Sequence, residues 1–81
     1  MKDEKLFLDT YFTLENLISI RTQLLKNGWI IKSDENKVKI FESKDDEYWD
    51  DMMCENEGES YEESLLMCLI EIKKYYRRVT T

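Results

Sequence analysis

The longest apolar face in this sequence lies toward its C-terminus, and it limits the folds that the chain can adopt. Ser60 and Glu63 form a capping box, in which each residue can satisfy the other's unpaired backbone amide and start a helix. The predicted helix runs to about Arg78. Its apolar positions recur at helical spacing: Leu65, Leu66, Leu69, Ile70, Ile72 and Tyr76, with Met67 and Cys68 widening the face. In a chain of 81 residues, the other elements of one small domain, residues 1–81, must cover this face.

A second helix is predicted earlier in the chain. Thr13 suits its N-cap, and Glu15 suits the first turn, where the helix dipole favours a carboxylate. Gly28 suits the left-handed position that ends many helices. The apolar residues between them follow mostly helical spacing: Leu14, Leu17, Ile18, Ile20, Leu24 and Leu25. Before this helix, residues 5–12 could form either a short strand or an irregular lead-in.

The centre of the chain has the composition of β-strands. Two β-prone runs, residues 29–32 and 37–42, flank the turn-forming residues 33–36, and this pattern predicts a β-hairpin. Within the second run, Val38 and Ile40 alternate with lysines, so one face of that strand should be buried and the other should face water.

Residues 44–57 fit two different structures. One is a helical turn capped by Ser43 or Asp45, and the other is a third strand beside the hairpin. We favour the strand because an isolated hairpin is only marginally stable. The predicted fold class is therefore α+β, a two-layer sandwich in which two helices pack on one face of a three-stranded antiparallel sheet, in the order αβββα.

Charge is distributed unevenly along the chain, whose formal net charge is −6. Ten carboxylates and no lysine or arginine lie between Asp45 and Glu63, whereas the remainder holds eight acidic and twelve basic residues, a net charge of +4. Mutual repulsion of so many carboxylates costs stability, which indicates that their concentration has a role. Two interpretations are open: a solvated face that keeps a small protein soluble, or a surface that occupies a basic groove in place of nucleic-acid phosphates.

The predicted partner-binding surface combines these acids with two aromatic side chains. Tyr48 and Trp49 stand among the carboxylates and could stack in the basic site of a nucleic-acid-handling host protein. The predicted binding residues are Asp45, Asp46, Glu47, Tyr48, Trp49, Asp50, Asp51, Glu55, Glu57 and Glu59. The acidic balance argues against direct binding of nucleic acid or of an anionic membrane.

The alternative prediction is a self-associating structural or adaptor protein. In that case an excess of apolar side chains would form a hydrophobic homodimer interface, and the candidates are Trp29, Phe41, Met52 and Met53. Salt distinguishes the two predictions, because contacts made by carboxylates weaken with ionic strength and a hydrophobic interface does not.

The sequence offers little for catalysis or for metal binding. It has no histidine, only two glycines and no phosphate-binding glycine motif, so we predict a non-enzymatic protein with no catalytic residues and no cofactor. The acids around Asp46 lack the spacing of an EF-hand, and two distant cysteines cannot form a tetrahedral zinc site. No metal site is predicted.

Cysteine usage and the absence of long apolar runs indicate a soluble, cytoplasmic protein. Cys54 and Cys68 fit reduced intracellular thiols, with a single bridge between them as the alternative. The charged first residues do not resemble a signal peptide, and no apolar run approaches the roughly 20 residues of a membrane span.

Two segments of the chain carry a family resemblance. One is Leu24-Leu25-Lys26-Asn27-Gly28-Trp29, where a helix leads into a hairpin, and the other is the small–apolar–Cys segment Ser64-Leu65-Leu66-Met67-Cys68-Leu69. With these segments the chain resembles a group of small phage and prophage proteins, the phage ABA sandwich domain. The resemblance spans about residues 13–72, although the last helix is bulkier and the third segment more acidic than in the family. It implies a two-layer α/β fold and a mobile-element origin, and no activity. In size, acidity and element order the chain is also similar to anti-CRISPR inhibitors that mimic nucleic acid, without a shared motif.

Overall fold

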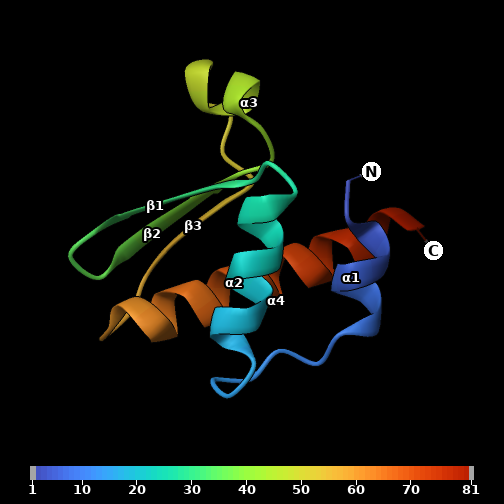
Figure 1. Cartoon of the computed structure of the whole chain (residues 1–81), viewed down its shortest axis with the longest axis horizontal. Coiled ribbons are helices and arrows are strands. Elements are labelled where there is room, and N and C mark those ends of the chain that lie inside the picture. Colours follow the sequence, from blue (N-terminus) through green and yellow to red (C-terminus); the bar gives the residue numbers. More distant parts are fainter. Residues whose placement is uncertain (1, 81) are drawn as a thin grey trace.

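Four helices and three strands alternate along the computed structural model, which describes residues 2–80 (Figure 1). They are α1 (Glu4–Asp9), α2 (Leu17–Lys26), β1 (Ile30–Asp34), β2 (Lys37–Phe41), α3 (Lys44–Tyr48), β3 (Cys54–Glu57) and α4 (Tyr61–Thr80). The strands form one antiparallel sheet in the order β1-β2-β3. The predicted α+β fold, with its three-stranded antiparallel sheet and C-terminal helix, is confirmed.

One face of the sheet is covered by helices and the other is open. The long helix α4 packs across β2 and β3, while α2 contacts β1 and α4 (Figure 1). Val38 and Ile40 are fully buried on the covered face, as their alternation with lysines predicts. The core joins both layers: Phe7, Phe12, Leu17, Ile20, Leu24, Trp29, Val38, Ile40, Leu65, Cys68, Leu69, Ile72 and Tyr76.

The hairpin between β1 and β2 is confirmed, and its turn is shorter than predicted. Ile30 pairs with Phe41 at one end and Asp34 pairs with Lys37 at the other, which leaves a two-residue connection. The register also places Lys32 opposite Lys39 on the open face of the sheet. Because antiparallel partners share a face, the lysines of both strands lie together on that face.

The first helix was not expected from the sequence. Residues 5–12 were predicted to be a strand or an irregular lead-in, and instead α1 forms a helix that lies against the C-terminal half of α4 (Figure 1). Phe7 is its one buried residue, and its ring lies 5.7, 5.4 and 5.3 Å from the rings of Phe12, Trp29 and Tyr76. A helix with a single buried side chain leaves no apolar period to detect, which explains the wrong prediction.

Polar contacts tie the N-terminal segment to three other elements. The carboxylate of Asp3 accepts a hydrogen bond from Trp29 Nε1 at 2.6 Å, beside the end of α2. The Lys2 ammonium donates to the Glu42 carbonyl at 2.9 Å, just after β2, and the Tyr76 hydroxyl of α4 donates to the Lys2 carbonyl at 2.8 Å. The N-terminal segment therefore covers the end of the core where the end of α2, the end of β2 and α4 come together.

The second helix begins three residues later than an N-cap at Thr13 predicts, because Asn16 is the residue before its first turn. Thr13 and Asn16 hold a turn instead: Thr13 N–H donates to Asn16 Oδ1 at 3.0 Å, and Asn16 N–H donates to Thr13 Oγ1 at 3.3 Å. These are the reciprocal bonds of a capping box, here made by a short amide side chain that keeps its own backbone out of the helix. The predicted end is confirmed, since Gly28 has a φ of 91°.

Residues 44–57 adopt both of the structures that their sequence allows. The preferred strand was wrong for the first half, where Ser43 caps the short helix α3 by accepting the Asp46 N–H at 3.2 Å. It was right for the second half, where β3 pairs with β2 and places Cys54 opposite Ile40. Carboxylates in the first turn of α3 stabilise it through the helix dipole, which favours the helix locally over a longer strand.

The C-terminal helix begins where the capping box predicts. Ser60 Oγ accepts the Glu63 N–H at 3.1 Å, and the helix continues to Thr80, slightly beyond the predicted end. Its buried face is narrower than predicted, because Met67 is exposed and Leu66 is only half-buried. None of the helices described here is long and apolar enough to cross a bilayer.

Candidate functional site: an acidic and aromatic surface

A short helical excursion between β2 and β3 carries the most exposed aromatic side chains of the acidic segment. α3 and the turn that follows it project from one end of the sheet, away from α4 (Figure 1). Tyr48 is 78% exposed and Trp49 is 75% exposed, and their rings pack edge to face with centroids 4.9 Å apart. With the neighbouring exposed carboxylates, they form what we call the α3 surface: Asp45, Tyr48, Trp49, Asp50 and Asp51.

Backbone hydrogen bonds hold this surface in one conformation. Asp50 has a left-handed φ of 56°, its N–H donates to the Glu47 carbonyl at 3.1 Å, and the Asp51 N–H donates to the Asp46 carbonyl at 2.8 Å. This pair of bonds is a Schellman motif, with aspartate at the position that glycine usually takes. The motif ends α3 at Tyr48, with Trp49 as its C-cap residue. The aromatic pair is therefore presented on an ordered turn.

Several of the predicted site residues are engaged within the chain. Glu47 pairs with Lys32 of β1 at 2.9 Å, and Asp46 accepts a hydrogen bond from the Ser43 hydroxyl at 3.2 Å. Glu55 pairs with Lys37 of β2 at 2.9 Å, and this hydrogen-bonded lysine holds the pKa of the Glu55 carboxyl below its ordinary value. Lysines of the sheet thus partly neutralise Glu47 and Glu55, whereas Asp46 takes part in the cap of α3.

The structure divides the ten predicted residues into three places. Five form the α3 surface, while Asp46, Glu47 and Glu55 contribute to internal pairs or caps. Glu57 ends β3 and Glu59 follows it, so both lie at the opposite end of β3 from α3 and are exposed. The acidic segment thus follows the β3 edge of the molecule instead of gathering into one patch.

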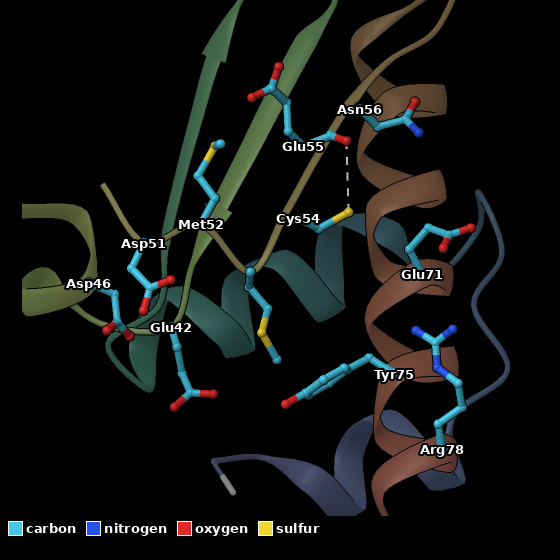
Figure 2. A pocket seen from close by; sticks show the side chains of 11 residues that line it. Glu42, Asp46, Asp51, Met52, Cys54, Glu55, Asn56, Glu71, Tyr75 and Arg78 are labelled. Carbon is cyan, nitrogen blue, oxygen red and sulfur yellow. Dashed lines mark hydrogen bonds between the residues drawn. The ribbon is translucent and has the colours of Figure 1, made fainter. Parts of the chain in front are cut away.

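A groove of about 810 Å³ lies between side chains of β3 and of α4 (Figure 2). We call it the β3–α4 groove. Its lining residues come from the approach to β3 and β3 itself (Met52, Met53, Cys54, Glu55 and Asn56), from α4 (Glu71, Tyr75 and Arg78), and from the α3 end (Glu42, Asp46 and Asp51). Five of the side chains are carboxylates and one is a guanidinium. The pattern of the sequence did not predict this groove, because its walls are distant in the chain.

Two thiols stand at the wall of this groove. Cys54 is half-buried and lines the groove, whereas Cys68 of α4 is fully buried behind it, and both are free. Hydrogen bonding from Cys68 lowers the pKa of Cys54. The same contact, together with burial, raises the pKa of Cys68 well above its ordinary value. At a given pH, a larger fraction of the accessible Cys54 than of Cys68 is therefore in the thiolate form.

We expect Cys54 to be alkylated by iodoacetamide near neutral pH while Cys68 stays unmodified until the chain unfolds, because the thiolate is the reacting form. A Cys68→Ala variant removes the hydrogen-bond donor, so the pKa of Cys54 should rise and its alkylation near neutral pH should slow. Cys68→Ser retains a donor and serves as the control. Mass spectrometry of the modified peptides gives both rates, and equal rates for Cys54 and Cys68 in the folded chain would contradict this assignment.

The apolar residues predicted for self-association are largely inaccessible. Trp29 and Phe41 are 1% and 2% exposed, so these two side chains are not accessible to a second copy in the folded chain. Of that set only Met52 is exposed. Exposed apolar side chains occur instead around the start of α2, where Leu14 and Ile18 were expected to face the core. Leu14 precedes α2, and within α2 the buried face is formed by Leu17, Ile20 and Leu24, which leaves Ile18 on another side of the helix.

No family model, curated protein or solved structure matches this chain. The resemblance to the phage ABA sandwich domain therefore stays a prediction. Within residues 2–80, no group of three or more cysteine, aspartate or glutamate side chains is arranged to hold a metal ion. The two features from which function can be argued are the α3 surface and the β3–α4 groove.

Proposed function

We propose that this chain is a small acidic binding protein whose α3 surface occupies a basic site on a partner protein. The observation that carries the proposal is the exposed, ordered pair of Tyr48 and Trp49 among carboxylates. Tryptophan and tyrosine are the side chains most enriched at the energetic centres of protein interfaces. Burying them against a partner returns about 25 cal/mol for each Å² of apolar surface removed from water.

The charge of the α3 surface indicates the chemistry of the partner. Asp45, Asp50 and Asp51 attract lysine or arginine side chains, and the faces of the two aromatic rings can accept a cation as well. The same arrangement has the elements of single-stranded nucleic acid, with negative charges beside flat rings that can stack. We therefore include in the proposal that the partner is a nucleic-acid-handling host protein, which a phage-encoded inhibitor of this kind would block.

The test compares two variants that change net charge equally. In D45N/D50N/D51N the α3 surface loses its carboxylates, whereas in D9N/E15Q/E35Q three exposed carboxylates elsewhere are neutralised. The immobilised chain is exposed to a bacterial lysate at low and at high salt, and retained proteins are identified by mass spectrometry. If each carboxylate contributes about 0.5 kcal/mol, the α3 variant should bind its partner about tenfold more weakly, and the matched control should bind normally.

A competition assay with the recovered protein then distinguishes simple binding from inhibition of its nucleic-acid binding. The wild-type chain should compete with nucleic acid for the recovered protein, and the α3 variant should not. Trp49→Ala should weaken binding by at least about 2 kcal/mol if Trp49 is a central anchor. A folded α3 variant that retains the same protein at the same strength would remove the basis of the proposal, as would retention that does not respond to salt.

A further inference from the structure

The outer edge of β3 borders the β3–α4 groove. β3 pairs with β2 on one side, and among the described strands none pairs with its other side. Figure 2 shows the Glu55 carbonyl oxygen on the groove side, where the Cys54 thiol approaches it at 3.9 Å. Since the N–H and C=O of one strand residue point to the same side, Glu55 presents both backbone groups to the groove. Such an edge is a template for a further strand.

The edge has a defined length. The Met53 N–H donates to the Ile40 carbonyl at 2.8 Å although Ile40 already pairs with Cys54, so two consecutive residues lie against one, as in a β-bulge. Regular pairing is therefore limited to Cys54–Glu57. At about 3.3 Å per residue this corresponds to an added strand of roughly four paired residues.

The lining of the groove indicates the composition of that strand. On the open sheet face, side chains of the added strand would lie beside Glu55 and Glu57. On the helix side they would meet the ring of Tyr75 and the carboxylate of Glu71 (Figure 2). Met53, which also lines the groove, adds apolar surface. Because successive side chains alternate between the two faces, the fitting sequence alternates lysine or arginine with apolar residues.

Charge also argues against a second copy of this chain as the occupant. Two β3 edges in contact would bring Glu55 and Glu57 of one copy against the same residues of the other, and like charges directly opposite one another are destabilising. Short edges with charged side chains are how folded proteins prevent such self-pairing. A basic strand would instead be attracted to this edge, because its cations would lie beside these carboxylates.

We infer that the β3–α4 groove receives an extended segment of a basic partner, which joins the sheet as a fourth strand beside β3. The inference rests on the proposed function in that the partner is basic, and it adds a second contact to the one made by the α3 surface. The backbone of β3 supplies the hydrogen bonds. The carboxylates of the groove select for lysine and arginine.

A model peptide tests the inference without knowledge of the partner. The probe is a capped peptide of about eight residues that alternates lysine and valine, a length that covers the edge. Its control has the same sequence with every backbone nitrogen methylated, so that charge is retained while the donors for strand pairing are lost. The probe should shift the NMR amide signals of residues 54–57 and slow the alkylation of Cys54, which lines the groove. The methylated peptide should do neither.

Two charge reversals on the same helix locate the contact. Glu71→Lys places a cation in the groove and should weaken binding of the probe, whereas Glu62→Lys changes an exposed residue outside the groove and should have less effect. Equal effects of the two peptides, shifts confined to residues 47–50, or no shifts at all would overturn the inference. Asp51 borders both the α3 surface and the groove, so the proposed function is judged separately by D45N/D50N, which leaves the groove lining intact, and peptide signals confined to residues 47–50 would leave it standing.

Discussion

Replacing Phe7 by alanine should lower the free energy of unfolding by about 3–5 kcal/mol, the usual cost of removing a buried phenylalanine ring. The Phe7 side chain is fully buried and its ring contacts those of Phe12, Trp29 and Tyr76. These three residues belong to different segments, so the cavity would lie where α1, the end of α2 and α4 meet. A domain of this size has roughly 5–15 kcal/mol of total stability, so much of it would be lost.

Urea denaturation followed by tryptophan fluorescence measures this effect. Trp29 lies beside Phe7 and is buried, whereas Trp49 is exposed and should report little change on unfolding. Lys5→Ala in the same helix is the matched control, because Lys5 is exposed and alanine favours helices. A loss below about 1 kcal/mol for Phe7→Ala would mean that α1 does not contribute to the core as the ring contacts indicate.

The elements that could be predicted from the sequence are those specified by neighbouring residues. Ser60 and Glu63 mark the start of α4, and Gly28 marks the end of α2, because helix ends depend on a few adjacent side chains. The hairpin follows from the alternation around Val38 and Ile40, whose side chains are both buried. These features need no knowledge of the tertiary fold.

The elements that were missed depend on distant contacts. α1 is short and has one buried residue, so its position results from the rings of Trp29 and Tyr76 and from no local period. The late start of α2 results from a side-chain amide, Asn16, that competes with helical backbone bonds. In residues 44–57, the capped helix α3 and the strand β3 follow each other within a segment that was treated as one element.

The residue types of the candidate site could be predicted from the sequence, but their arrangement on the surface could not. The sequence indicates that carboxylates and aromatic residues are concentrated after residue 44, and Tyr48 and Trp49 are indeed exposed together. It does not indicate that Lys32 engages Glu47 or that Lys37 engages Glu55, because these pairs arise from strand register. Nor does it indicate the β3–α4 groove.

The aromatic pair lies on an excursion between two paired strands, so the proposed binding would be separate from folding. The strands β2 and β3 hold the two ends of the excursion, while Tyr48 and Trp49 contribute no side chain to the core. Loops held by a rigid scaffold tolerate variation and commonly carry function. Substitutions on the α3 surface should therefore change binding with little effect on stability, whereas substitutions around Phe7 should do the reverse.

The hydroxyl of Ser64 connects three segments at the end of the sheet that lies away from α3. Ser64 is the one fully buried polar side chain among the described residues. Its hydroxyl accepts the Gly58 N–H at 2.7 Å, after β3, and donates to the carbonyl of Asn36 in the hairpin turn. It also lies 2.8 Å from the Ser60 carbonyl. The hairpin, the connection from β3 and the start of α4 thus share one side chain.

Ser64→Ala should therefore destabilise the chain by about 1–3 kcal/mol, because the loss of this buried hydroxyl leaves two partly buried hydrogen bonds unmade. In this variant the Ser60 carbonyl still accepts a hydrogen bond from the N–H of residue 64, at 3.0 Å. The groups that lose a hydrogen-bond partner are therefore the Gly58 N–H and the Asn36 carbonyl. Ser19→Ala, on the exposed side of α2, is the control and should change stability little. Urea denaturation gives the free energies, and hydrogen exchange should show faster exchange at the Gly58 amide. Unchanged exchange there would mean that another group satisfies Gly58, and the stability lost would then have to come from packing alone.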